Sequence, residues 1–173
     1  PILIEDYNAN PDPPILQKVQ EIDDAIIYLT FGPPYPKKAD MVDYLYAESR
    51  PVFSRKIYEV LKNKDIKGVK FIPTIVRDTD DNEYKDYWFT NIYQKYAFMD
   101  QQNSDKIHGP DPTSIRWSVV NKMVINPELI NKVPLEERLI FVPAECTGYP
   151  LYHKSIVDLI MSVNPEGLIF VPI

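Results

Sequence analysis

Residues 50–73 read RPVFSRKIYEVLKNKDIKGVKFIP, and residues 149–172 read YPLYHKSIVDLIMSVNPEGLIFVP. The two stretches align without a gap when the glycine of one is placed on the glycine of the other. The shared motif positions are Pro51, Gly68, Phe71 and Pro73 in the first copy and Pro150, Gly167, Phe170 and Pro172 in the second. The chain therefore contains an internal repeat of 24 residues.

Each copy predicts a short extended piece, a helix and a strand. Apolar residues such as Ile57 and Leu61 recur at the spacing of one face of a helix, and the second copy repeats them. Ser54 and Ser155 are predicted N-caps. The glycine that follows is typical of a helix end, where a left-handed backbone is commonly needed. The apolar run after it, VKFIP or LIFVP, predicts a buried strand closed by a proline.

The rest of the chain adds further strands to this repeat. We expect strands over Ala25–Phe31 and Ser114–Asn126, hairpins across Asp78–Asn82 and AECTG (residues 144–148), a short helix opening at Pro127, and a possible helix near Asp40–Glu48. The predicted fold class is α+β, with a mainly antiparallel sheet and packed helices. At 173 residues the chain is expected to form a single domain, 1–173.

Composition narrows the class of function. The formal net charge of −6 argues against nucleic-acid binding, which needs several Lys or Arg on the phosphates, and favours a basic partner. The apolar runs are too short to span a membrane. The five glycines are spread too widely for a phosphate-cradling loop, so we expect no nucleotide cofactor. The single cysteine favours the reducing cytoplasm.

The acidic turn that starts at Asp78 has two interpretations. Asp78, Asp80 and Asn82 are spaced like the first ligands of a calcium loop, but Glu83 and Phe89 stand where glycine and glutamate are required. We therefore expect no metal site. A partner-binding patch is the better hypothesis, because carboxylates beside aromatic side chains combine steering charge with anchors. The candidate residues are Asp78, Asp80, Asp81, Glu83, Tyr84, Asp86, Tyr87 and Trp88.

A catalytic alternative rests on Cys146 and His153. A cysteine hydrolase or acyltransferase places a thiolate beside a histidine, and the two residues could meet across a hairpin. Against this, a free cysteine is commonly a small buried hydrophobe, and His153 matches the helix-start position Ser54. A non-catalytic protein is therefore expected. A regulatory binding module is a third possibility.

Several quoted stretches carry a resemblance to a known family. RPVFSRKIYEVLKNKDIKGVKFIPTIV, then YKDYWFTNIYQKYAFMDQQNSD, and later LIFVPAECTGYPLYHKSIVDLIMSVNPEGLIFVPI resemble a bacterial family of immunity proteins of polymorphic toxin systems. The matching positions are Gly68, Phe71, Pro73, Asn91, Asp100, Gly167 and Phe170. The resemblance covers about residues 50–173 and leaves 1–49 as a variable N-terminal part. It implies a protein that binds and neutralises a cognate toxin without catalysis, and its motif positions have the character of core and turn residues.

Overall fold

The computed structural model describes residues 2–5, 26–31, 41–47, 49–108, 117–146 and 148–173. The protein is α+β, as the sequence predicts, with mostly antiparallel strand pairs. The described elements are β1 (Ile2–Glu5), β2 (Ile27–Phe31), β3 (Tyr44–Ala47), β4 (Arg50–Ser54), α2 (Arg55–Leu61), β5 (Val69–Arg77), β6 (Glu83–Ile92), β7 (Lys95–Tyr96), β8 (Asp105–His108), β9 (Trp117–Lys122), α3 (Pro127–Ile130), the 3₁₀ turn η2 (Leu135–Glu137), β10 (Ile140–Pro143), β11 (Leu151–Tyr152) and α4 (Lys154–Met161).

Two compact units share these elements, and each unit is made of separate stretches of chain. Unit 1 comprises Pro1–Lys64, Lys70–Asn91 and Ile160–Leu168. Unit 2 comprises Asp65–Val69, Ile92–Leu159 and Ile169–Ile173. Therefore α2 lies in unit 1 and the turn after it in unit 2, whereas most of α4 lies in unit 2 and the turn after it in unit 1. That the whole chain folds as one cooperative domain stays a prediction.

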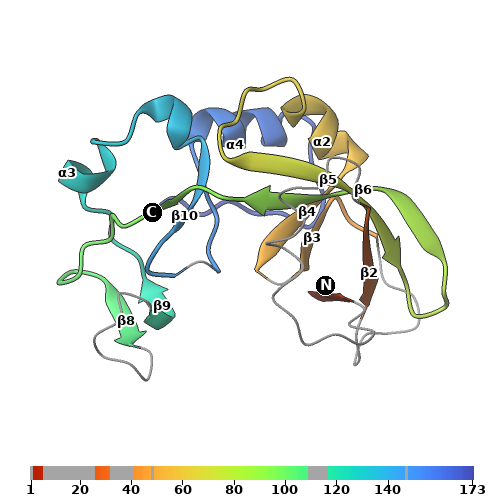
Figure 1. Ribbon diagram of the computed structural model, residues 1–173, viewed down its shortest axis with the longest axis horizontal. Coiled ribbons are helices and arrows are strands. Elements are labelled where there is room, and N and C mark those ends of the chain that lie inside the picture. Colours follow the sequence, from red (N-terminus) through yellow and green to blue (C-terminus); the bar gives the residue numbers. More distant parts are fainter. Residues whose placement is uncertain (1, 6–25, 32–40, 48, 109–116, 147) are drawn as a thin grey trace. The chain divides into compact units, whose positions relative to one another are not determined.

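Unit 1 is a closed six-stranded barrel with the strand order β1-β2-β5-β6-β4-β3 (Figure 1). The pairs β1–β3 and β2–β5 are parallel, whereas β1–β2, β3–β4 and β4–β6 are antiparallel. Side chains alternate between the two faces of each strand. In β2, Ile27, Leu29 and Phe31 are buried while Tyr28 is exposed. The barrel core is lined by these residues together with Leu45, Ala47, Val52, Ile72, Val76, Tyr87 and Phe89.

The first copy of the repeat forms the predicted helix and strand. Ile57 and Leu61 of α2 are fully buried, and Gly68 has the left-handed φ of +70° that ends the turn after the helix. The expectation that Pro73 closes the strand is wrong, because β5 continues to Arg77. The register explains this: the ladder with β2 begins at Thr74, so the missing N–H of Pro73 costs β5 no hydrogen bond to β2.

The second copy forms the helix but not the strand. Gly167 repeats the left-handed φ, at +78°, but the residues after it form no strand, and Ile169 and Val171 are 86% and 77% exposed. The predicted buried strand over LIFVP is therefore wrong. A strand exists only where a neighbour accepts its ladder hydrogen bonds. In the described chain this segment has no such neighbour, and Phe170 packs its ring edge on Tyr152 at 5.2 Å.

The starts of the two repeat helices differ from the predicted serine caps. Ser54 precedes α2 but makes no capping hydrogen bond. The prediction for Ser155 is wrong, since α4 already begins at Lys154. His153 fills the capping role instead, and its Nδ1 accepts a hydrogen bond from the Ser155 amide at 3.2 Å.

The predicted helix near Asp40–Glu48 is also wrong. Residues 44–47 form β3, which pairs with β4 on one side and β1 on the other. Tyr44, Leu45 and Tyr46 suit a half-buried strand, and the alternation of buried Leu45 with its half-buried neighbours has period two. Asp40 and Glu48 themselves lie outside the described residues.

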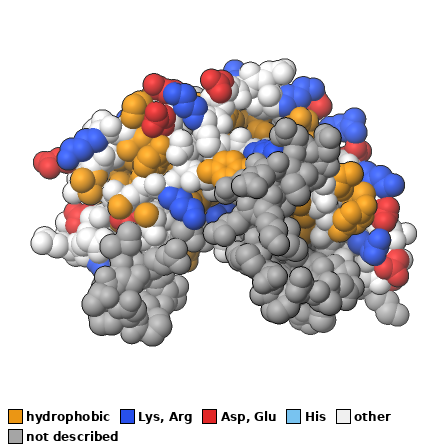
Figure 2. Space-filling model, in the orientation of Figure 1, with side chains coloured by type: hydrophobic (Ala, Val, Ile, Leu, Met, Phe, Trp, Pro, Cys, Tyr) orange, Lys and Arg blue, Asp and Glu red, His pale blue; other side chains and the backbone are white. Residues whose placement is uncertain are grey.

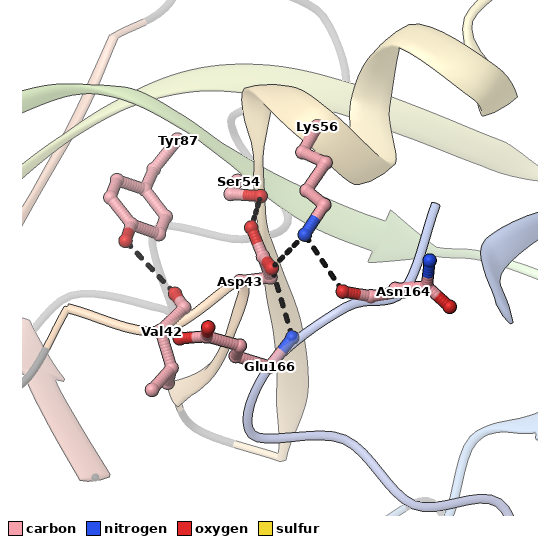
Figure 3. Close-up of polar contacts among 7 residues, drawn as sticks. All are labelled: Val42, Asp43, Ser54, Lys56, Tyr87, Asn164 and Glu166. Atoms are coloured by element: carbon pink, nitrogen blue, oxygen red, sulfur yellow. Dashed lines mark hydrogen bonds and ion pairs between the residues drawn. The ribbon is translucent and has the colours of Figure 1, made fainter. Parts of the chain in front are cut away.

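Asp43 holds the chain segment after α4 in unit 1 (Figure 3). Its carboxylate accepts hydrogen bonds from Ser54 Oγ at 2.6 Å, from the Glu166 amide at 2.9 Å and from Lys56 Nζ at 3.2 Å. Lys56 also donates to the carbonyl of Asn164 at 2.7 Å. Burial raises the pKa of Asp43, but these hydrogen bonds outweigh it, so the pKa lies below its ordinary value. The carboxylate is therefore ionised at neutral pH, and together with Lys56 it binds residues 164–166.

Unit 2 contains two small sheets and a separate core. β10 lies between β11 and β7 in one sheet, and β8 pairs with β9 in the other. The antiparallel pairing of β10 with β11 confirms the predicted hairpin around AECTG. The helix predicted at Pro127 is α3, where Asn126 accepts capping hydrogen bonds from two backbone amides. The core is formed by Phe98, Met99, Ile130, Phe141 and Cys146. Within the described residues of both units, no helix is long and apolar enough to cross a membrane.

Candidate partner-binding surface

The turn between β5 and β6 is organised by Asp78. This side chain is only 1% exposed, and its oxygens accept hydrogen bonds from the amides of Asp80 and Asn82, from the Asn82 side chain and from Tyr84 Oη, at 2.9–3.2 Å. The hydrogen bond from the Asn82 side chain leads the effects that lower the pKa of Asp78. Asp78 therefore builds the turn, and almost none of its surface is exposed.

Asp80 and Asp81 form the exposed tip of this turn. Neither carboxylate has a hydrogen-bond or ion-pair partner among the described residues, and both side chains are exposed. Asp81 has a left-handed backbone with φ of 62°, which Asp tolerates better than most residues. The tip therefore presents two unneutralised negative charges on an ordered turn.

The other two carboxylates of the candidate patch, those of Glu83 and Asp86, form ion pairs. Glu83 lies between Arg77, at 3.0 Å, and Lys85, at 3.5 Å, and the hydrogen bond from Arg77 is the leading cause that lowers its pKa. Asp86 accepts from Arg55 of α2, with N–O distances of 2.5 and 3.1 Å. All of these side chains are substantially exposed, so each pair contributes little to stability. They form a mixed-charge border around the hairpin.

The aromatic residues of the patch have three different positions. Tyr87 is 6% exposed in the barrel core, where its hydroxyl donates to the Val42 carbonyl (Figure 3), and burial raises its pKa to about 12. Tyr84 is half-buried and donates to Asp78. Trp88 lies on the outer face of the barrel, because β6 alternates and Tyr87 and Phe89 point inward. Of the three aromatic residues, Trp88 is the one that reaches the hairpin's outer face.

Residues of α2 complete this surface, and the sequence reasoning missed them. The Tyr58 ring stacks on Trp88 with the centroids 4.1 Å apart and the planes 6° apart. Tyr58 also meets Phe71 edge-on at 5.7 Å, and the Arg55 guanidinium lies 6.0 Å from the Trp88 ring. The signal for this arrangement was weak, because Arg55 and Tyr58 look like an ordinary solvated helix face in the sequence.

The hairpin therefore brings together aromatic and charged groups of the kind that protein interfaces favour. At the right of the view in Figure 2, over the hairpin, hydrophobic side chains reach the surface with Lys, Arg, Asp and Glu side chains around them. Trp, Tyr and Arg are the residue types that most often dominate binding energy at an interface. Among the described residues, no group of three or more His, Cys, Asp or Glu is placed to hold a metal ion.

The geometry does not supply what the catalytic alternative requires. Cys146 is 6% exposed, and its Sγ lies 3.6 Å from the sulfur of Met99. Burial, followed by the charge of Glu145, raises the pKa of the Cys146 thiol to about 11, whereas a nucleophile needs a lowered pKa. His153 is engaged with Ser155. The two side chains make no hydrogen bond to one another.

Four of the seven positions that carried the family resemblance have structural roles. Asn91 is buried at the end of β6. Asp100 closes a turn by accepting from the amides of Gln102 and Asn103, and the hydrogen bond from the Asn103 side chain is the leading cause that lowers its pKa. Gly68 and Gly167 both have left-handed backbones. These residues build the fold and do not line the hairpin surface.

The fold and this surface define a small α+β protein whose conspicuous exposed groups suit protein recognition. The model of the immunity protein family Imm11 matches residues 6–134, which is more than half of the chain. The chain therefore belongs to the Imm11 immunity protein family. The match includes most of the first fifty residues, which the resemblance had left unassigned, and ends before the second repeat copy. No curated protein matches the chain significantly.

Proposed function

We propose that the protein neutralises a cognate toxin of a bacterial polymorphic toxin system by binding it stoichiometrically in the cytoplasm. The observation that carries this proposal is membership of the Imm11 family over residues 6–134. The protein acts without catalysis, by occluding the active site of the toxin or the path of its substrate. Binding of this kind needs an exposed surface with anchors and complementary charge.

The β5–β6 hairpin supports this proposal as part of the toxin-binding surface. Asp80 and Asp81 carry the unneutralised charge, Glu83 and Asp86 lie in the charged border, and Trp88 is the aromatic anchor. The net charge of −6 favours a basic partner. Asp78, Tyr84 and Tyr87 contribute indirectly, because they hold the turn and the strand in place.

The first experiment is a protection and capture assay. The tagged protein is expressed in its native host and recovered with its partner, and the partner is identified by mass spectrometry. The toxin domain of the recovered partner is then produced separately, with and without this protein. We expect a one-to-one complex and survival of cells that express both proteins. Cells that die in spite of the protein, together with the absence of a complex, would overturn the proposal.

The role of the hairpin charges is tested by removing them. Asp80→Asn and Asp81→Asn together keep the turn, because Asn also tolerates a left-handed backbone. We expect association with the toxin domain to slow by about threefold to tenfold at low salt, and its salt dependence to weaken. Glu128→Gln with Glu136→Gln is a matched control, because it also removes two negative charges from exposed residues, here in unit 2. Equal association rates for all three proteins would exclude the hairpin tip as a steering surface.

The test of non-catalytic action is the reactivity of Cys146. With a pKa raised to about 11, the buried thiol should react with a thiol reagent at pH 7.5 far more slowly than free cysteine. A Cys146→Ala variant should still protect cells from the toxin. Fast labelling combined with loss of protection in that variant would favour the cysteine-dependent alternative.

A further inference from the structure

Among the described residues, the outer face of the barrel is covered by α2 on one side and exposed on the other. On the covered side, Phe53 of β4 pairs with Trp88 of β6 and is fully buried, and Tyr58 of α2 stacks on Trp88. On the other side, Tyr28 of β2 is 53% exposed and the preceding Ile26 is 54% exposed. Both sides belong to unit 1, so the difference is a property of the barrel.

The register of β2 and β5 places their outward-facing side chains next to one another. β2 and β5 are parallel, with Ile27 beside Thr74 and Tyr28 beside Ile75. Ile27 and Thr74 are buried, so the next residue on each strand faces outward. Pro73, which precedes Thr74 as Ile26 precedes Ile27, is also exposed. We define the exposed residues Ile26, Tyr28 and Pro73, together with the half-buried Ile75, as the β2–β5 face.

This face is continuous with the aromatic surface of the hairpin. The Phe89 amide donates to Thr74 Oγ1 at 2.9 Å, which places residue 89 of β6 beside residue 74 of β5. Trp88 therefore emerges on the same outer side as Pro73 and Ile75. The β2–β5 face thus extends the surface of Trp88 and Tyr58 across three neighbouring strands.

We propose that the β2–β5 face is the apolar centre of the toxin-docking surface, and that it binds an apolar patch bordered by Lys and Arg on the toxin. This inference rests on the proposed function. Interfaces commonly combine an apolar centre with a polar rim. Here the rim is the end of β5 and the hairpin. Glu83 forms ion pairs with Arg77 and Lys85, whereas Asp80 and Asp81 have no ion-pair partner among the described residues.

Charge decides which partner fits this face. Among the described residues of its rim, the two charges without an ion-pair partner are both negative, so Lys or Arg on the partner would complement them. A second copy of this chain would bring the same two carboxylates into a symmetric interface, where like charges repel. An anionic membrane surface would be repelled in the same way. The toxin is therefore the occupant that the observations favour.

Binding measurements on outward-facing variants test this proposal. The probe is an inactivated toxin domain of the partner recovered in the capture assay, titrated against wild type, Tyr28→Ser, Ile26→Ser and the matched control Leu135→Ser. Leu135 is 47% exposed and lies in unit 2. We expect Tyr28→Ser to weaken binding at least about tenfold, mainly through faster dissociation, and the control to bind like wild type.

Footprinting of the unmodified protein covers the case in which Tyr28→Ser does not fold. Hydroxyl-radical labelling of wild type with and without the toxin domain should show protection at Ile26, Tyr28 and Ile75 and none at Leu135. Absence of that protection, or wild-type affinity in a folded Tyr28→Ser variant, would overturn this inference while the proposed function stands. Absence of any binding to wild type would instead overturn the proposed function.

Self-association is checked in the same samples. Sedimentation of the protein alone at binding concentrations should give a monomer. A dimer that Tyr28→Ser dissolves, with toxin affinity unchanged, would assign the face to a second copy and overturn the proposal.

Discussion

The two copies of the repeat have nearly the same pattern but different structures after the glycine. In the first copy Gly68 leads into β5, which has β2 and β6 as neighbours in the barrel. In the second copy Gly167 leads into a segment that forms no strand, although it is the more apolar of the two. The local pattern therefore sets the helix and the turn, whereas the strand depends on a neighbour elsewhere in the chain.

The largest expected difference lies four residues after each glycine. Ile72 is 1% exposed in the barrel core, whereas the matching Val171 is 77% exposed. We expect Ile72→Ala to lower the free energy of unfolding by about 3 kcal/mol, from lost burial and the cavity that remains. Val171→Ala should change it by less than about 0.5 kcal/mol. Urea denaturation measures both, and similar losses in the two variants would mean that the second segment is buried after all.

The glycines themselves should be the next most sensitive positions. A Cβ at Gly167 would lie 2.7 Å from Cγ2 of Val42, which is β-branched and has little freedom to move. We expect Gly167→Ala to cost about 3 kcal/mol, because this clash adds to left-handed backbone strain. At Gly68 a Cβ would lie 2.1 Å from Cγ of Gln94, but this unbranched side chain can rotate away about χ1, so Gly68→Ala should cost about 1–2 kcal/mol. Thermal and urea unfolding of the pair test this order, which equal losses would contradict.

The hydrogen bonds of Asp43 give a smaller, pH-dependent effect. Because the folded-state pKa lies below 3.8, the ionised carboxylate stabilises the fold fully above that value and loses this contribution as the pH falls through the folded pKa. Asp43→Asn should cost about 1–2 kcal/mol at pH 7 and less at pH 3. Unfolding free energies measured between pH 7 and pH 2.5 give the comparison. A loss that does not depend on pH would show that ionisation of Asp43 is not what binds residues 164–166.

The smallest expected effect is at the helix starts. His153 accepts a hydrogen bond from the Ser155 amide, whereas the matching Ser54 turns its hydroxyl to Asp43. We expect His153→Ala to cost about 0.5–1 kcal/mol through the lost cap, with faster amide exchange in the first turn of α4. Ser155→Ala keeps the amide and serves as the control. If the amides in the first turn of α4 exchange at the same rate in both variants, the histidine ring is not the cap.

Local signals predicted the elements that are stabilised locally. The apolar spacing of α2 and α4, the proline at the first position of α3 and the acidic turn after β5 are each visible in a short window of sequence. The stretch that contains β3 was expected to be a helix. The strand is set instead by pairing with β4 and β1. The closed barrel was not predicted, because its parallel β2–β5 pair joins residues far apart in sequence.

The candidate surface was predicted in part for the same reason. The sequence indicated Asp80, Asp81 and Trp88, which are close together in the chain. It did not show that Asp78 and Tyr87, in the same stretch, are buried in the fold. It also missed Tyr58, because its contact with Trp88 arises only when a helix and a strand from different parts of the chain pack together.

The hydrogen bond between Asp43 and Glu166 has a consequence for biosynthesis. It joins residues 123 positions apart. At about 5–20 residues per second, a ribosome needs roughly 6–25 s to pass from one residue to the other. Throughout that time the barrel unit lacks residues 160–168, which belong to it. A nascent chain that has reached residue 134, where the family match ends, therefore contains Asp43 but not the backbone amide that it binds.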